Sequence, residues 1–369
     1  MDFKIQQKIF ADLLDKAYRF VGTGSSMPIL KGLLLKVTHD GELIIKASNL
    51  EQGITICSDE INNNGGEFSV VLPADKLRSI VKALPPRTVK LKRKLQKSGA
   101  EIESDGVDYE LNGFSVEEFP EFPELDSDQG IKLDGEGFKE IIDKVSVCAA
   151  AGDQKPGLKA VLLKSDEDNG IDFCATNTFR MALYEDKQNS GEFKLLAPAN
   201  MLQIVSRVLD EDQAVRMAYD QSHILFEQDK MKVYSRQIEG KFPNYDQVIP
   251  KSYDAWAEVE KEKLMAAARR AGMINDTIQL TCDDVKLHIK AEGEDGEGRE
   301  QIYGIRFEDH KEEGYAAIKI DASYLQDAIK AIDGDTVRFE FNGEINPLMV
   351  TDPARDNYTH LIMPIRPEA

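Results

Sequence analysis

The chain has 369 residues, with 46 lysines and arginines against 66 aspartates and glutamates, and a formal net charge of −20 at pH 7. This length exceeds what one hydrophobic core usually holds, so it predicts two or three domains. The negative charge excludes a protein that grips nucleic acid over its whole surface, because phosphates would be repelled, but it permits a local basic surface.

The composition predicts neither a membrane protein nor an exported one. Hydrophobic residues make up 41% of the chain and charged residues 30%, as in ordinary globular proteins. The longest apolar run is about five residues, far short of a membrane span. The N-terminal MDFKIQQKIF does not resemble an export signal, so a cytoplasmic protein is expected. Cys57, Cys148, Cys174 and Cys282 lie far apart, and we expect reduced thiols without a metal.

Two amphipathic helices recur three times along the chain. The first reads IFADLLDKAY from Ile9, GFKEIIDKVS from Gly137 and KLMAAARRAG from Lys263. The second reads ADKLRSIVKALPP from Ala74, ANMLQIVSRVL from Ala199 and ASYLQDAIKAI from Ala322, at spacings of 125 and 123 residues. These spacings are close to one third of the chain and predict a triplicated unit.

Alternating segments follow each second helix and suit strands with one face in water. They read TVKLK from Thr88, AVRMAY from Ala214 and TVRFEF from Thr336. Other short alternating runs, such as LLLKVTHDGELIIKA from Leu33, predict antiparallel hairpins. Each unit ends alike, with Phe119-Pro120, Phe242-Pro243 and Met363-Pro364.

These repeats predict an α+β fold made of three tandem copies of one domain. Each copy is expected to hold two helices on one face of antiparallel sheets. The proline-rich FPEFPEL and the segment NYDQVIPKS mark the boundaries, which gives domains 1–125, 126–252 and 253–369.

Basic residues recur at equivalent places on the helices. Lys82, Arg207 and Lys330 lie opposite the apolar stripe of the second helix, and Lys16, Lys144 and Arg270 flank the stripe of the first. Any one of them is explained by ordinary solvation of an exposed helix position. Six at two equivalent positions, in an acidic chain, favour a basic surface that faces the phosphates of DNA.

Helix spacing then indicates how many copies would surround a duplex. Six helices at spacings of about 9 Å leave almost no hole, whereas twelve give a clear diameter of about 25 Å. A DNA duplex of roughly 20 Å would pass through that opening. Two chains arranged head to tail are therefore predicted to form a ring.

Several motifs together resemble the bacterial DNA polymerase III beta subunit, the sliding clamp, over essentially the whole chain. They are MPILKGLLLKV from Met27, VVLPADKL from Val70, TNTFRMA from Thr176, GKFPNYDQVIPK from Gly240 and HLIMPIR from His360. The resemblance implies a head-to-tail homodimeric ring that encircles double-stranded DNA and tethers the polymerase. It also implies no catalytic residues, no cofactor, and opening by a separate ATP-driven clamp loader.

The resemblance further implies a groove between the second and third domains, where the polymerase and the clamp loader insert short peptides with apolar anchors. The residues that match the family's groove are Leu158, Thr176, Arg180, Met181, Pro243, Val248, Leu361, Ile362, Met363, Pro364, Ile365 and Arg366. Because Phe-Pro also occurs at 119, where the family has no groove, Pro243 is also explained by shaping the domain end.

The chain departs from the family pattern at several places. Thr178-Phe179 stands where Gly-His is common, which predicts a bulkier and less polar groove wall, and Pro367-Glu368-Ala369 extends the C-terminus. Gly24 and Pro156-Gly157 occupy places where other members carry DNA-contacting side chains. DNA contact would then depend on the helix-borne cations, and a divergent second copy of the clamp stays open as an interpretation.

Other chemistry finds little support in the sequence. VGTGSSMP from Val21 lacks the Lys-Ser/Thr ending of a phosphate loop, and SDEDNGIDF from Ser165 lacks the closing Glu of a calcium loop. The five histidines are scattered without metal-ligand spacing. The open readings are a DNA sliding clamp and a clamp-fold scaffold that organises protein partners with weak or no DNA engagement; a hydrolase is remote.

Overall fold

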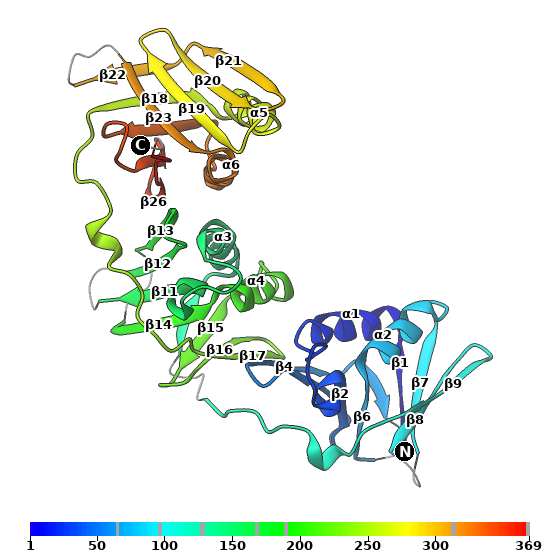
Figure 1. The fold of residues 1–369 in the computed structure, drawn as a ribbon. Helices are drawn as coiled ribbons and strands as arrows, with labels where there is room; N and C mark the ends of the chain where they lie inside the picture. The colour runs from blue at the N-terminus through cyan, green and yellow to red at the C-terminus, as the bar shows by residue number, and fades with distance from the viewer. Residues whose placement is uncertain are drawn as a thin grey trace. The chain divides into compact units, whose positions relative to one another are not determined.

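The computed structural model describes residues 1–63, 66–94, 98–125, 130–166, 170–187, 191–310 and 315–366 (Figure 1). In these residues six α-helices occur, two in each predicted repeat, as the sequence predicts. The helices are α1 Gln7–Tyr18, α2 Ala74–Ala83, α3 Gly135–Val145, α4 Ala199–Val208, α5 Lys261–Gly272 and α6 Ala322–Ala331. None of the helices described is long and apolar enough to cross a membrane.

The strands recur in the same order in the three repeats. The first repeat contains β1 Asp2–Gln6, β2 Gly32–Val37, β3 Leu43–Ser48, β4 Gln52–Ser58, β5 Ile61–Asn63, β6 Phe68–Pro73, β7 Thr88–Arg93, β8 Gly99–Ser104 and β9 Val107–Asn112. The second contains β10 Ile131–Leu133, β11 Ala160–Ser165, β12 Ile171–Thr176, β13 Arg180–Asp186, β14 Phe193–Pro198, β15 Val215–Tyr219, β16 His223–Gln228 and β17 Met231–Arg236.

The third repeat contains β18 Ala255–Glu260, β19 Thr277–Asp283, β20 Lys286–Gly293, β21 Gly296–Tyr303, β22 Arg306–Asp309, β23 Tyr315–Asp321, β24 Thr336–Phe341, β25 Leu348–Asp352 and β26 Arg355–Ile362. In each repeat the second helix directly follows β6, β14 or β23 and precedes β7, β15 or β24. The α+β class with antiparallel pairing is therefore confirmed.

The sheets do not stop at the ends of the repeats. An eight-stranded sheet runs β10-β15-β16-β17-β4-β3-β2-β6 and joins the first two repeats where β17 pairs with β4. A nine-stranded sheet runs β14-β11-β12-β13-β26-β25-β24-β18-β22 and joins the last two where β13 pairs with β26. We call these pairings the first and the second junction.

Because of this pairing, the chain forms two compact units that divide the middle repeat. Unit one comprises 1–138 and 204–237, and unit two comprises 139–203 and 238–369. Each unit contains one of the two junctions. Unit one also holds the five-stranded sheet β5-β1-β7-β8-β9, and unit two the four-stranded sheet β21-β20-β19-β23.

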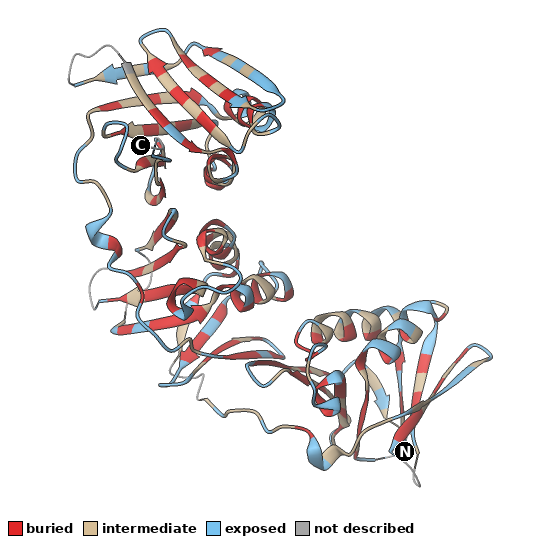
Figure 2. Ribbon diagram, viewed as in Figure 1, coloured by how far each residue is buried: buried red, intermediate tan, exposed pale blue. Residues whose placement is uncertain are grey.

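Buried positions recur at helical and strand periods in each unit (Figure 2), and apolar residues occupy most of them. In unit one, α1 packs against α2 and β3, and Phe10, Leu14 and Leu77 are fully buried. In unit two, α5 packs against α6 and β20, and Leu264 and Leu325 are fully buried. Burying each such side chain contributes about 1.5–3 kcal/mol, so these faces hold the helices on the sheets.

Candidate functional site

A groove of about 180 Å³ opens in unit two where β13 begins and β26 ends. Its walls are mostly apolar, with a few hydroxyl, amide and guanidinium groups. The lining residues are Thr176, Thr178, Arg180, Met181, Pro243, Asn244, Val248, Leu361 and Met363. Seven of these nine are among the twelve residues named from the sequence.

The remaining five predicted residues lie elsewhere around this groove. Ile362 and Leu158 are buried and are not among the residues that line the groove as described, so their part in it stays a prediction. Pro364 is partly buried, whereas Ile365 and Arg366 are exposed at the end of the described chain. Pro367-Glu368-Ala369 lies outside the described residues.

A strained turn shapes one wall of the groove. Asn177 Oδ1 accepts hydrogen bonds from the backbone N–H groups of Phe179 and Arg180, each at 2.9 Å. Thr178 has a φ of 77°, which is costly for a β-branched residue. Thr178 lines the groove, whereas Phe179 does not and is 63% exposed. The bulkier wall expected from Thr178-Phe179 is therefore formed by the threonine.

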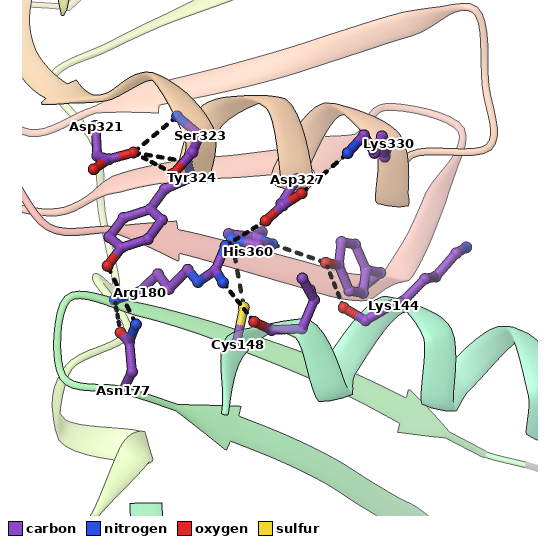
Figure 3. A network of polar contacts seen from close by, with 12 residues as sticks. Lys144, Cys148, Asn177, Arg180, Asp321, Ser323, Tyr324, Asp327, Lys330 and His360 are labelled. Carbon is purple, nitrogen blue, oxygen red and sulfur yellow. Dashed lines mark hydrogen bonds and ion pairs between the residues drawn. The ribbon is translucent and has the colours of Figure 1, made fainter. Parts of the chain in front are cut away.

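Contacts from residues elsewhere in the chain hold the Arg180 side chain in place (Figure 3). Its Nη1 donates to Asp327 Oδ2 at 2.7 Å, and its Nη2 donates to the Val147 carbonyl at 2.5 Å. The guanidinium also stacks on the Tyr324 ring, 4.4 Å from its centroid. With a side chain only 12% exposed, Arg180 is a fixed part of the groove.

The start of α6 positions two of these partners. Asp321 caps the helix, because its Oδ1 accepts from the backbone N–H groups of Ser323 and Tyr324 at 2.8 and 3.1 Å. Tyr324 then lies over Arg180, and Asp327 follows one turn later. Asp327 Oδ1 also accepts from Lys330 Nζ at 3.2 Å.

A buried polar cluster lies beside Arg180 in the same unit (Figure 3). His360 contacts the Tyr358 hydroxyl at 2.9 Å and Cys148 Sγ at 3.6 Å. Burial, with the nearby Arg180 charge, lowers the pKa of His360 to about 3. Burial raises the pKa of Cys148 to about 12, so its sulfur is a thiol and not a reactive thiolate at neutral pH. The cluster therefore serves packing.

Lys144 is not the solvent-facing cation that the sequence predicts. The residue is only 8% exposed, and its Nζ lies 2.6 Å from both Glu140 Oε1 and Asp333 Oδ2. Burial would raise the pKa of Asp333, but the hydrogen bond and charge of Lys144, together with Arg355, hold it below its usual value. The charge of Lys144 is thus balanced inside unit two.

Four of the other five predicted cations also have acidic neighbours. Arg207 is exposed and forms no ion pair with any residue that the structure describes. The pairs of the others are Lys16 with Asp12 at 3.1 Å, Lys82 with Asp15 at 2.8 Å, Arg270 with Glu300 at 2.6 Å, and Lys330 with Asp327 at 3.2 Å. These acids reduce the positive potential that each cation offers to phosphates.

No group of three or more His, Cys, Asp or Glu side chains within the described ranges could hold a metal ion. Tyr324, Asp327 and Asn244 were not found from the sequence. The TNT sequence could have indicated the turn, because Asn and Thr favour such hydrogen bonds. Asp327 and Tyr324 lie 147 residues from their groove partners, a separation that no local pattern bridges.

Three family models match consecutive parts of the chain. They are the DNA polymerase III beta subunit N-terminal domain over residues 1–123, its central domain over 132–244 and its C-terminal domain over 246–366. Curated relatives include the beta sliding clamp of Staphylococcus aureus, which is 26% identical over 381 residues and covers 99% of both chains. The beta sliding clamp of Staphylococcus epidermidis is also 26% identical, with the same coverage.

Solved structures share the fold over the whole chain. The DNA polymerase sliding clamp from Bacillus subtilis matches with a TM-score of 0.92 and 23% identity, covering 100% of each chain. The beta subunit from DNA polymerase of Streptococcus pyogenes matches with a TM-score of 0.92 and 21% identity, again over 100% of each chain.

Proposed function

The chain belongs to the DNA polymerase III beta subunit family, the sliding clamps, and from this premise we propose that it acts as a head-to-tail dimeric ring. The ring encircles duplex DNA and confers processivity on the replicative DNA polymerase. The protein has no catalytic site or cofactor of its own in this proposal, and it works in the cytoplasm.

The observation that carries the ring proposal is a pair of complementary open sheet edges. Within the chain, β4 pairs with β17 and β13 pairs with β26. In the order of the repeats, β9 corresponds to β17 and β26, and β21 corresponds to β4 and β13. Among the described strands, β9 and β21 are each the last strand of a sheet. Two chains can therefore pair β9 with β21 twice and bring twelve helices together.

Exposed apolar side chains beside these edges support the same assembly. Tyr109 on β9 is 48% exposed although it lies opposite the buried Ile102. Met273, which follows α5, is 81% exposed, and the neighbouring Ile274 is also exposed. Large apolar side chains next to an unpaired strand edge suit a surface that another chain covers.

The groove supports the second part of the proposal, capture of partner peptides. An extended segment with apolar anchors could place them against Met181, Leu361 and Val248, while Arg180 and Thr176 offer polar contacts. We propose that the polymerase and the clamp loader bind there through short motifs, with Met363, Pro364, Ile365 and Arg366 at one rim.

The neutralised cations favour a second candidate function. Lys144 is buried, and Lys16, Lys82, Arg270 and Lys330 are paired with acids. Paired cations release fewer counterions on binding phosphates, so the attraction to DNA is weaker. A clamp-fold scaffold that binds proteins with weak or no DNA engagement is the alternative that this observation supports.

Topological retention separates the two functions. The protein is loaded on nicked circular DNA with a cognate ATP-driven loader and then separated by gel filtration. A clamp stays with the circle and is lost when the DNA is linearised. A dimer that binds partner peptides but is never retained on the circle would contradict the clamp and favour the scaffold.

A further inference from the structure

We propose that β9 of one chain and β21 of a second chain pair in one register, in which Asp108 faces Arg299 and Tyr109 covers Gly298. The inference rests on the proposed dimer and specifies how its two interfaces recognise each other. It makes the partner of each edge a second copy of this chain with the complementary charge at one position.

The repeats fix the place of β9 in the register. The strand β17 begins after the hairpin in which Gln228 pairs with Met231, and β9 begins after the equivalent hairpin in which Ser104 pairs with Val107. Val107 therefore takes the place of Met231. At the first junction, Met231 pairs with Ile56 on β4.

The place of β21 follows from its distance to the second helix. Gly32 pairs with Pro73 just before α2, and Thr277 pairs with Asp321 just before α6. Leu35, three residues after Gly32, pairs with Ile45, which in turn pairs with Ile56. Leu280, three residues after Thr277, pairs with Ile289, which in turn pairs with Glu300. Glu300 therefore takes the place of Ile56.

Combining the two correspondences gives the register between chains. Val107 pairs with Glu300, so Asp108 pairs with Arg299 and Tyr109 pairs with Gly298 in the antiparallel order. Opposite charges directly across an antiparallel pair stabilise it, and like charges destabilise it.

The outward faces of the two edges carry complementary charges. Asp108 is exposed and makes no ion pair with any described residue of its own chain. Arg299 is 72% exposed, and its Nε lies 2.6 Å from Glu297 Oε1, two residues away on the same strand. Glu297 also lies 3.5 Å from Lys290 Nζ, so Arg299 can turn to Asp108 without leaving Glu297 unpaired.

The inward faces are complementary in shape. Gly298 lies opposite the buried Ala291, and a Cβ placed on it would meet only Ile274 Cγ1, at 3.4 Å. This leaves space above the strand for an aromatic side chain from the other chain. Tyr109 lies on the face of β9 that also carries the buried Ile102, so its ring would cover Gly298 and reach Ile274. An aromatic ring across from a strand glycine is a recurrent way to complete a sheet.

The chain already uses the same device at the first junction. Tyr234 pairs with Gly53, and a Cβ on Gly53 would collide with the Tyr234 ring. That ring is buried and its hydroxyl lies 2.7 Å from Ser48 Oγ.

A charge swap tests the register by sedimentation of the full chain. Asp108→Arg places two arginines at both interfaces and Arg299→Asp places two aspartates there, so each variant alone should dimerise about tenfold more weakly. Mixing the two variants creates an Arg–Asp pair at both interfaces of the mixed dimer. The mixture should recover the dissociation constant of the unmodified chain to within about threefold.

A matched control separates the register from net charge. Asp40→Arg makes the same charge change in an exposed hairpin turn outside both edges. Mixed with Arg299→Asp, it restores the opposite-charge pair at only one of the two interfaces, so the mixture should recover only part of the lost affinity. Equal recovery with Asp40→Arg, or none with Asp108→Arg, would overturn the register while a dimeric unmodified chain leaves the ring proposal standing. A monomeric unmodified chain would overturn both.

Disulfide trapping reads the register directly. Tyr109→Cys combined with Gly298→Cys should give a covalent dimer under mild oxidation, because directly opposed Cβ atoms lie about 4.5–5.5 Å apart. Val107→Cys combined with Gly298→Cys places the pair on a diagonal of about 7–8 Å and should cross-link far less. Preferential cross-linking of the second variant would show a shift by two residues and reject the inference.

Discussion

The two junctions have the same backbone turn and the same strand pairing, but they differ in the side chains packed beside the paired strands. Asn49 Oδ1 accepts from the backbone N–H groups of Glu51 and Gln52 at the first junction, as Asn177 Oδ1 does for Phe179 and Arg180 at the second. Leu50 and Thr178 both have a φ of 77°. A groove is described at the second junction, whereas at the first the Tyr234 ring fills the corresponding space.

One cross-strand pair decides this difference. Gly53 faces Tyr234 at the first junction, and Met181 faces Leu361 at the second. The missing Cβ of Gly53 admits the Tyr234 ring, which also packs against Phe122 at 4.7 Å between centroids. Met181 and Leu361 instead stand beside an open space. The same strands therefore give a closed joint or a binding groove according to two side chains.

Removing the aromatic ring of Tyr234 should have the largest effect on stability. Tyr234→Ala deletes a buried aromatic side chain and its contact with Ser48, so the free energy of unfolding should fall by about 3–4 kcal/mol. Urea unfolding followed by circular dichroism measures this. Tyr234→Phe, which keeps the ring, should lose only about 1 kcal/mol. Equal losses in the two variants would contradict the filling role of the ring.

Placing the glycine–tyrosine pair of the first junction at the equivalent positions of the second junction should close the groove. Met181→Gly combined with Leu361→Tyr should weaken binding of a fluorescent polymerase-tail peptide by about 2 kcal/mol, because the ring would occupy the anchor space. Fluorescence anisotropy measures the affinity. Leu361→Met, which conserves volume, should bind like the unmodified chain. Undiminished affinity in the double variant would place the peptide elsewhere.

Truncating the rim of the groove should have a somewhat smaller effect. Arg366→Ala combined with Met363→Ala should weaken capture of the same peptide by about 1.5–2 kcal/mol and leave the assembly intact by sedimentation. Ile345→Ala with Arg306→Ala removes a comparable exposed pair outside the groove and should change nothing. A groove assignment cannot stand if both double variants bind alike.

The junctions should also differ in their response to pH. His360 lies opposite Ala182 at the second junction, where Val233 lies opposite Ile54 at the first. The pKa of His360 is about 3 in the folded chain, below the unfolded value of about 6.5, so the unfolded chain binds the proton more readily. The contribution of His360 to the free energy of unfolding is therefore fully present above pH 6.5 and is lost as the pH drops toward 3.

Between pH 7.5 and 5.5 unit two should lose about 1.4 kcal/mol from this histidine. Trp256, the single tryptophan, lies on β18 in unit two and reports its unfolding by fluorescence. His360→Val copies the first junction and should flatten the slope. A slope that survives the substitution would assign the pH dependence to other groups.

Much of the fold could be predicted from periodicity alone. The 3.6-residue period located the helices and the two-residue period located strands such as β7, β15 and β24. The groove was predicted in large part from motif resemblance, with Thr176, Arg180 and Met181 in place. The burial of Lys144 was missed, because Asp333 and its neighbours approach from another repeat.

Apolar periodicity is a local property of the chain, so the triplication, the α+β class and the positions of the helices could be predicted from the order of the residues. Which strands join the repeats, which edges stay open and which cations are neutralised became visible only in the folded chain. Pairing and burial depend on neighbours more than a hundred residues away, and a strand's alternation records which face is buried but not which strand lies beside it.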